Sequence, residues 1–210
     1  MATVDSLHTL LVEELRDIYD AEKRLTKAIP KMAKAATNDD LRTALEEHLA
    51  ETEQQVVRLE EAFEELEAPA KGKPCAGMKG IIEEGDEHVG EDFDDDGLRD
   101  ATIIGAAQRV EHYEMAAYGT AIAHARLLDQ SGVVKLLEQT LAEEKQADEK
   151  LTEIAESVVN LDAASQEDES SMPRTGPSSR RQAPRSQRSQ AASSSRAGKR
   201  SRKSTSRSRR

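Results

Sequence analysis

The chain has 210 residues, of which 36% are hydrophobic and only 2% aromatic, and it carries a formal net charge of −11. The single cysteine, Cys75, excludes an internal disulfide framework and favours a reduced, cytoplasmic setting. No apolar run approaches the roughly 18 residues of a membrane span, and the N-terminus lacks a signal-peptide pattern. We therefore expect a cytoplasmic protein without a membrane partner.

The charge divides the chain into two parts of opposite sign. Residues 170–210 hold 13 Lys or Arg and no acid. Residues 1–169 contain all 41 acidic residues and 17 basic ones, so this part of the chain carries a net charge of about −24. Since the basic segment consists mainly of Ser, Arg, Gln, Ala and Lys without apolar periodicity, we predict a disordered tail over residues 163–210. Residues 1–162 are predicted to form one acidic domain.

The first half of this domain has the apolar spacing of two amphipathic helices. We predict the first over about residues 4–36, with a kink or break at Pro30. The second is predicted over about residues 40–66, after a tight turn whose Asn and Asp residues can cap it. The short connection predicts an antiparallel hairpin.

The second half repeats this arrangement, with helices predicted over about residues 98–129 and 133–159 and a short turn between them. About 30 residues separate the two hairpins, and they include the stretch CAGMKGIIEEGDEHV, which can hold a short helix. Two hairpins joined by one long crossover predict an all-α four-helix bundle.

Each predicted helix loses its apolar character near its middle. In an antiparallel hairpin, facing residues have numbers that sum to about twice the centre of the turn. By this rule the polar residues that interrupt the two apolar stripes of a hairpin lie at one height within that hairpin, and this holds for each of the two hairpins. The polar residues at or beside the inward positions are Glu22, His48, Glu51, Glu111, Glu114, Glu144 and Asp148.

A group of carboxylates with one imidazole inside a bundle has the ligand chemistry of a hard metal ion. Two divalent cations would neutralise four carboxylates and so allow them to be buried. For any single glutamate the competing interpretation is a solvated helix flank. The coincidence of the whole set at one level favours the metal site.

Five stretches, in this order, resemble the YciE/YciF family of ferritin-like proteins: ELRDIYDAEKRL, EEHLAETEQQVVRLE, CAGMKGIIEEG, QRVEHYEMAAYGTA and LAEEKQADEKLTEIA. The resemblance covers about residues 3–160. It implies a ferritin-like four-helix bundle that is usually dimeric, a di-iron site, and a link to bacterial stress responses. Members of the family are often described as ferroxidases.

The resemblance also implies a role for each carboxylate. It makes Glu22 the first-helix carboxylate, Glu51 the second-helix bridge, Glu111 the third-helix terminal ligand, Glu114 an additional carboxylate and Glu144 the fourth-helix bridge, which the adjacent Glu143 could replace. The usual Glu-x-x-His pairs are missing, because His48 precedes Glu51 and Asp148 stands where a histidine is usual. Manganese is therefore an alternative to two iron ions.

The basic tail lies outside the resemblance. Arginine and lysine spaced by serine and glutamine suit contacts to phosphates without base reading, so we predict non-specific binding of DNA or RNA. The alternative is a solubilising extension that contacts the acidic domain. The residues expected to contact phosphates are Arg180, Arg181, Arg185, Arg188, Arg196, Lys199, Arg200, Arg202, Lys203, Arg207, Arg209 and Arg210.

These features favour a di-metal carboxylate protein that oxidises Fe(II) or consumes peroxide in stress protection. The alternative is a non-enzymatic stress protein whose bundle is structural and whose tail binds nucleic acid. A homodimer is expected from the resemblance and from the small residues of MAAYGTAIAHA, which allow another helix to approach closely.

Overall fold

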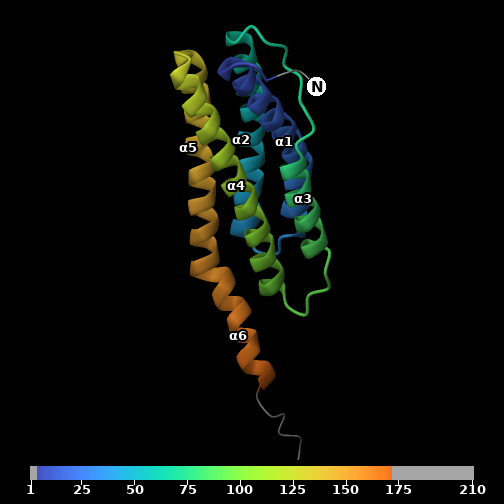
Figure 1. Ribbon diagram of the computed structural model, residues 1–210. Helices are drawn as coiled ribbons and strands as arrows, with labels where there is room; N and C mark the ends of the chain where they lie inside the picture. Colours follow the sequence, from blue (N-terminus) through green and yellow to red (C-terminus); the bar gives the residue numbers. More distant parts are fainter. Residues whose placement is uncertain (1–3, 172–210) are drawn as a thin grey trace, which may run out of the picture. The chain divides into compact units, whose positions relative to one another are not determined.

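The computed structural model describes residues 4–171, with side chains described up to residue 165. Over this range the chain is helical and contains no strand. The four long helices are α1 (Leu7–Ala35), α2 (Asp39–Glu65), α4 (Asp96–Leu127) and α5 (Ser131–Ile154) (Figure 1). The α1–α2 and α4–α5 hairpins lie side by side, with α1 against α4 and α2 against α5. This arrangement confirms the predicted all-α bundle of two hairpins.

Side-chain caps define where the first two helices begin. The Ser6 hydroxyl accepts a hydrogen bond from the backbone N–H of Thr9, at 3.1 Å, and starts α1. The Asn38 side chain accepts one from the N–H of Leu41, at 3.0 Å, and starts α2. Each cap satisfies a backbone donor that has no partner within the helix. Helix α1 continues through Pro30, so the break considered there does not occur.

The crossover between the hairpins contains the expected short helix, α3 (Ala76–Val89). It packs on the outside of the bundle against α1 and α4. The backbone N–H of Cys75 donates to the Asp20 carboxylate at 2.8 Å, and that of Lys73 donates to the carbonyl oxygen of Arg16 at 3.0 Å. These bonds hold the crossover along the length of α1.

The C-terminal part of the described chain follows α5 without a loop. A π-helical stretch (Ala155–Val159) leads into α6 (Asn160–Ser171), which spans the predicted domain boundary at residue 162. The predicted tail from residue 172 onward lies outside the described residues. Among the helices that the structure describes, none is both long and apolar enough to cross a membrane.

The core of the bundle consists of two separate apolar clusters. One includes Leu45 of α2 and Ile103 of α4, near the α1–α2 turn. The other includes Leu15 of α1 and Phe63 of α2, toward the opposite end. The layer between them is where each long helix presents polar side chains to the interior.

Candidate metal centre

The middle layer of the bundle is built from polar side chains that are almost fully buried. All of them have exposed fractions between 0% and 7%. They recur at helical spacings of three and four residues, so each helix turns them toward the same interior face. The set comprises Glu22 of α1, His48, Thr52 and Gln55 of α2, Glu111 and Glu114 of α4, and Thr140 and Glu144 of α5.

Four of these residues converge closely enough to share a metal ion. His48, Glu111, Glu114 and Glu144 each offer one ligand atom, and these atoms lie within 4.8 Å of one another. The His48 Nε2 atom is 3.4 Å from a Glu111 oxygen and 3.7 Å from a Glu144 oxygen. Three helices therefore direct a mixed imidazole and carboxylate set at one point.

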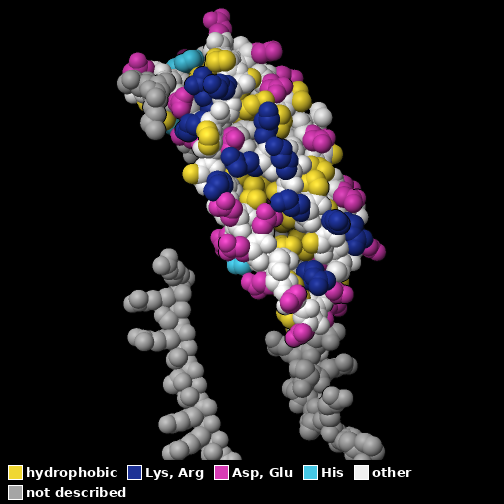
Figure 2. All heavy atoms as spheres, turned by 90° about the vertical axis from the view of Figure 1, so that its right-hand side faces the viewer, with side chains coloured by type: hydrophobic (Ala, Val, Ile, Leu, Met, Phe, Trp, Pro, Cys, Tyr) yellow, Lys and Arg dark blue, Asp and Glu magenta, His cyan; other side chains and the backbone are white. Residues whose placement is uncertain are grey.

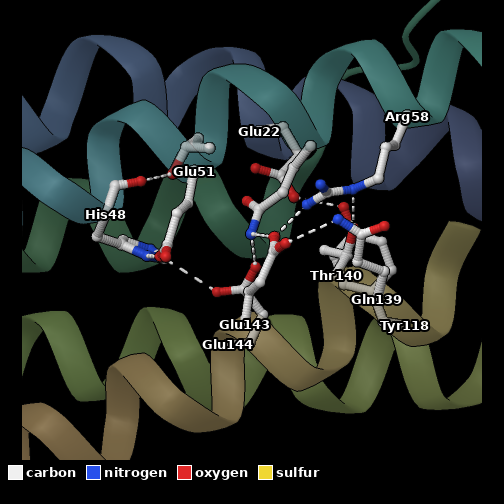
Figure 3. Close-up of polar contacts among 11 residues, drawn as sticks. Glu22, His48, Glu51, Arg58, Tyr118, Gln139, Thr140, Glu143 and Glu144 are labelled. Atoms are coloured by element: carbon white, nitrogen blue, oxygen red, sulfur yellow. Dashed lines mark hydrogen bonds and ion pairs between the residues drawn. The ribbon is translucent and has the colours of Figure 1, made fainter.

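Glu22 supplies a fourth carboxylate, from α1, and is completely buried. The Tyr118 hydroxyl donates a hydrogen bond to its Oε1 atom. Figure 3 shows Glu22, His48 and Glu144 in the same part of the interior, reached from three different helices. All four long helices thus contribute to the layer.

Burial raises the pKa of every carboxyl group in this set. The pKa of Glu22 rises to about 8, first because of burial and then because of the nearby charge of Glu144. For the same first reason, the pKa of Glu111 rises to about 8 and that of Glu144 to about 9. The pKa of Glu114 rises well above its usual range through burial and the charges of the other three. Without a cation, this layer therefore favours protonated carboxyl groups at neutral pH.

The same surroundings raise the pKa of His48 as well, which favours the charged form of this imidazole. Burial by itself would lower the pKa of His48. The carboxylate of Glu51, 3.5 Å from its Nδ1 atom, and the charges of Glu144 and Glu22 outweigh burial, and the pKa of His48 rises.

The hydrogen-bonding capacity of the layer is largely unused. Most buried polar atoms in folded proteins have a partner, because an unpaired one costs free energy. Within the described part of the chain, several ligand atoms of this layer have none: Glu22 Oε2, His48 Nδ1 and Nε2, Glu111 Oε2, Glu114 Oε1 and Oε2, and Glu144 Oε2. Such a set of oxygen atoms with one imidazole fits a hard or borderline divalent cation.

The structure separates the two adjacent candidates on α5. Glu144 points into the layer, where the Gln55 side-chain amide donates to its Oε1 atom. Glu143 lies at the edge of the layer, where it accepts a hydrogen bond from Gln55 at 3.2 Å and pairs with Arg58, whose guanidinium also donates to the Thr140 hydroxyl at 3.0 Å. Glu144 is therefore the member of the pair with access to a metal, and Gln55 orients it.

Glu51 and Asp148 do not join the buried set. The Glu51 side chain is 47% exposed and lies at the rim beside His48. The inward positions of α2 are His48, Thr52 and Gln55, spaced by four and three residues, and this register leaves Glu51 on the flank. The Asp148 carboxylate instead accepts a hydrogen bond from Gln108 at 3.1 Å.

A cavity of about 240 Å³ between α2 and α5 leads to this layer. Its lining includes His48 and Glu111 from the buried set and Glu51 from the rim. The apolar side chains of Leu45 and Leu151 form part of its wall. Ions and small molecules can therefore approach the site from the side of the bundle.

Known proteins are similar to this chain in sequence and in fold. Residues 6–164 match the family described as "Domain of unknown function (DUF892)". The chain belongs to the DUF892 family. It is 42% identical over 159 residues to Protein YciF of Escherichia coli (strain K12), in an alignment that covers 75% of this chain and 95% of that protein.

Two solved structures support the membership. The E. coli stress protein YciF matches with a TM-score of 0.71 and 41% identity, covering 75% of this chain and 99% of that one. YcfI from Rhodopseudomonas palustris matches with a TM-score of 0.69 and 44% identity, covering 72% and 98%. This DUF892 chain therefore shares the helical fold of YciF over nearly the whole length of YciF.

Three residues of the site have roles that sequence reasoning did not assign. Gln55 and Tyr118 stand at inward register positions, but nothing in the sequence identifies the carboxylates to which they donate. Arg58 lies one turn after Gln55, and its partner Glu143 is 85 residues away. Contacts between residues so far apart in the sequence become visible only when the hairpins are placed side by side.

Proposed function

We propose that this DUF892 protein binds a redox-active divalent metal, most simply two iron ions, and oxidises Fe(II) or consumes peroxide in stress protection. The observation that carries the proposal is the buried layer of ligand atoms without hydrogen-bond partners, between two apolar clusters. E. coli YciF, its relative, is described as a stress protein.

The donor set favours iron or manganese over softer metals. The proposed ligands are Glu22, His48, Glu111, Glu114 and Glu144. Their four carboxylates would balance the charge of two divalent cations, and carboxylate-rich sites with one imidazole suit Fe and Mn. Bound iron would supply one-electron chemistry toward oxygen or peroxide.

The side chains around these ligands prepare the site. Gln55 holds Glu144, and the Tyr118 hydroxyl holds Glu22, so two carboxylates are oriented before a cation arrives. Glu47 and Glu51 line the cavity that leads inward, where their negative charge would attract a cation.

The proposal is tested by the metal content of the full chain purified without chelator and loaded anaerobically with Fe(II). We expect close to two iron ions per chain for the wild type and a marked loss in the Glu111→Gln/Glu144→Gln variant. The matched control is Glu143→Gln, which changes the neighbouring carboxylate that pairs with Arg58 and should retain the iron.

Fe(II) oxidation, followed by absorbance, tests the activity separately. We expect the wild type to oxidise Fe(II) faster than buffer and the double variant to match buffer. A metal content near zero in the wild type would contradict the metal site. Bound iron without oxidation above the buffer rate would contradict only the ferroxidase activity and leave a metal-binding protein.

The alternative is a non-enzymatic stress protein with a structural bundle and a nucleic-acid-binding tail. The observation in its favour is the 13 basic and no acidic residues in the last 41 positions. A metal-free wild type whose DNA affinity falls steeply with salt would support it.

We also propose a homodimer formed through the outer face of α4. Ala116, Thr120, Ala123 and Leu127 are exposed along this face at spacings of four and three, and Leu127 is 75% exposed. Small residues allow a second helix to approach closely. Sedimentation of the full chain at micromolar concentration should give a dimer, and a monomer would refute the proposal.

A further inference from the structure

Basic residues are concentrated on one face of the otherwise acidic domain. Figure 2 shows a band of lysine and arginine side chains on the face formed by α1 and α3. Nine of the 17 basic residues before residue 170 lie on α1, on the crossover and at the start of α3. These are Arg16, Lys23, Arg24, Lys27, Lys31, Lys34, Lys71, Lys73 and Lys79.

This face contains an open groove of about 570 Å³, named the basic groove below. Five basic side chains line it, against two acidic ones, Asp20 and Glu83. Part of its floor is apolar and comes from Ala28 and Ile82. Its basic members are Lys23, Arg24, Lys27, Lys31 and Lys79.

Two of these cations are free to meet a ligand. Arg24, Lys31 and Lys79 each pair with a carboxylate, at 2.6, 3.1 and 2.8 Å. Lys23 and Lys27 are exposed, and neither pairs with a carboxylate of the described residues within 4.0 Å. The Lys23 ammonium lies 4.9 Å from the centre of the Tyr19 ring.

The row of lysines in the basic groove lowers the stability of α1 when no ligand is bound. Lys23, Lys27 and Lys31 follow one another at intervals of four residues, which places like charges side by side on α1. The rest of the domain carries a large excess of acids that could have separated them. A bound polyanion would remove this repulsion.

The shape of the row indicates an extended ligand. The eight residue steps from Lys23 to Lys31 cover about 12 Å along the helix axis. One strand of duplex DNA presents a phosphate about every 3.4 Å, so this length matches three to four phosphates. Lysine carries a compact charge and lacks the planar, two-pronged donor geometry of arginine. Such a side chain suits contacts to phosphates and does not distinguish one base from another.

A second copy of the chain fits this face less well. A two-fold symmetric contact brings the same surface of both protomers together, and here it would oppose two rows of lysines. A head-to-tail contact with an acidic face would build a ring or an open filament, not the two-fold dimer proposed above. We therefore propose that the basic groove binds the phosphate backbone of nucleic acid without sequence preference, separately from the metal layer and the tail.

The test compares two full-length variants that both keep the tail. Lys23→Gln/Lys27→Gln removes the two free cations of the groove. The control, Lys135→Gln/Lys145→Gln, removes two exposed lysines of α5. Helical circular dichroism should show that both variants are folded.

Binding to a 20-base-pair duplex is then titrated at several salt concentrations. Each phosphate contact contributes about 0.9 to the slope of log affinity against log salt, so the groove variant should lose about 2 from this slope. At 50 mM salt its affinity should fall roughly tenfold or more. The α5 variant should match the wild type. Equal affinities and slopes for all three proteins would overturn the proposal.

Chemical acetylation of lysines, read by mass spectrometry, locates the contact on the full chain. The duplex should protect Lys23, Lys27 and Lys31 at low salt and leave Lys135 and Lys145 reactive. Protection that depends on protein concentration without DNA would assign the face to a second copy. Binding of poly-glutamate as tight as that of the duplex would assign it to an acidic protein. Either of these outcomes overturns the proposal.

Discussion

Asp100 and the glutamates of the middle layer are all buried carboxyl groups, yet their surroundings differ completely. Asp100 is 2% exposed and accepts three hydrogen bonds, from the backbone N–H and the hydroxyl of Thr37 and from the backbone N–H of Asn38, at 2.8, 2.6 and 2.7 Å. Glu114 is 1% exposed, and no amide, hydroxyl or guanidinium donor of the described residues reaches either of its oxygens.

The difference is the one expected between a structural carboxylate and a metal ligand. Asp100 fastens the start of α4 to the turn between α1 and α2, and all of its bonds go to protein groups. The middle layer leaves most of its carboxylate oxygens without a donor and places them beside one another, which destabilises the metal-free fold. A bound cation is the group that would convert this cost into stabilisation.

The largest expected effect on stability is at Asp100, the carboxylate that accepts three hydrogen bonds. Asp100→Ala should lower the free energy of unfolding by about 3 kcal/mol, because three donors lose a charged acceptor. Urea unfolding measures the loss. Asp96→Ala, four residues earlier on α4, is the control, because its exposed pair with Arg99 should contribute less than about 1 kcal/mol. Equal effects of the two changes would contradict a special role for Asp100.

Substitution in the middle layer is expected to raise the free energy of unfolding of the metal-free protein, whereas Asp100→Ala lowers it. In the metal-free protein at pH 8, Glu111→Gln/Glu144→Gln should raise the free energy of unfolding by about 2 kcal/mol, because two buried groups can no longer become charged. Added Fe(II) should stabilise the wild type and leave the variant unchanged. Urea unfolding after chelator treatment, with and without anaerobic Fe(II), measures both. A destabilised metal-free variant would show that these carboxylates are structural, as Asp100 is.

The metal-free protein should also lose stability as the pH rises. In the folded state the pKa values of Glu22 and Glu111 are about 8 and that of Glu144 is about 9, whereas unfolded glutamates titrate near 4.5. Between these values the folded chain holds protons that the unfolded chain releases, so each rise in pH favours unfolding. His48, whose pKa is also raised, acts in the same direction above its unfolded pKa of 6.5.

Urea unfolding at pH 5 and pH 9 measures this dependence. The free energy of unfolding should fall by more than about 1.4 kcal/mol, the equivalent of one pKa unit for one group. The Glu111→Gln/Glu144→Gln variant should show a smaller fall. A wild type that gains stability over this range would be inconsistent with protonated glutamates in the layer.

The smallest change in stability is expected when Glu22 loses the hydrogen bond that Tyr118 donates to it. Tyr118→Phe keeps the buried ring and removes the hydroxyl that donates to Glu22, so it should cost about 1 kcal/mol in the metal-free protein. Thermal and urea unfolding measure this loss. A cost as large as that of Asp100→Ala would mean that Glu22 depends on protein donors in the way that Asp100 does.

Periodicity in the sequence determined the helices, the two hairpins and the height of the polar layer. Apolar residues at spacings of three and four place Glu22, Glu111, Glu114 and Glu144 on inward faces, and the lengths of the connections pair the helices. These features depend on neighbours within one helix or one short turn. The chain alone therefore contains the information that specifies them.

Only the tertiary structure decided which of several neighbouring polar residues enter the layer. Glu143 and Glu144 are adjacent on α5, and both accept a hydrogen bond from Gln55 on α2, but only Glu143 also pairs with Arg58, at the edge of the layer. The register of α2 already turns His48 inward and Glu51 to the flank, and the packing of α2 against α5 leaves that flank 47% exposed. Consecutive residues of a helix differ by about 100° in direction, so periodicity selects a face, whereas packing against another helix decides how far a polar residue at the edge of that face is covered and which partner it meets.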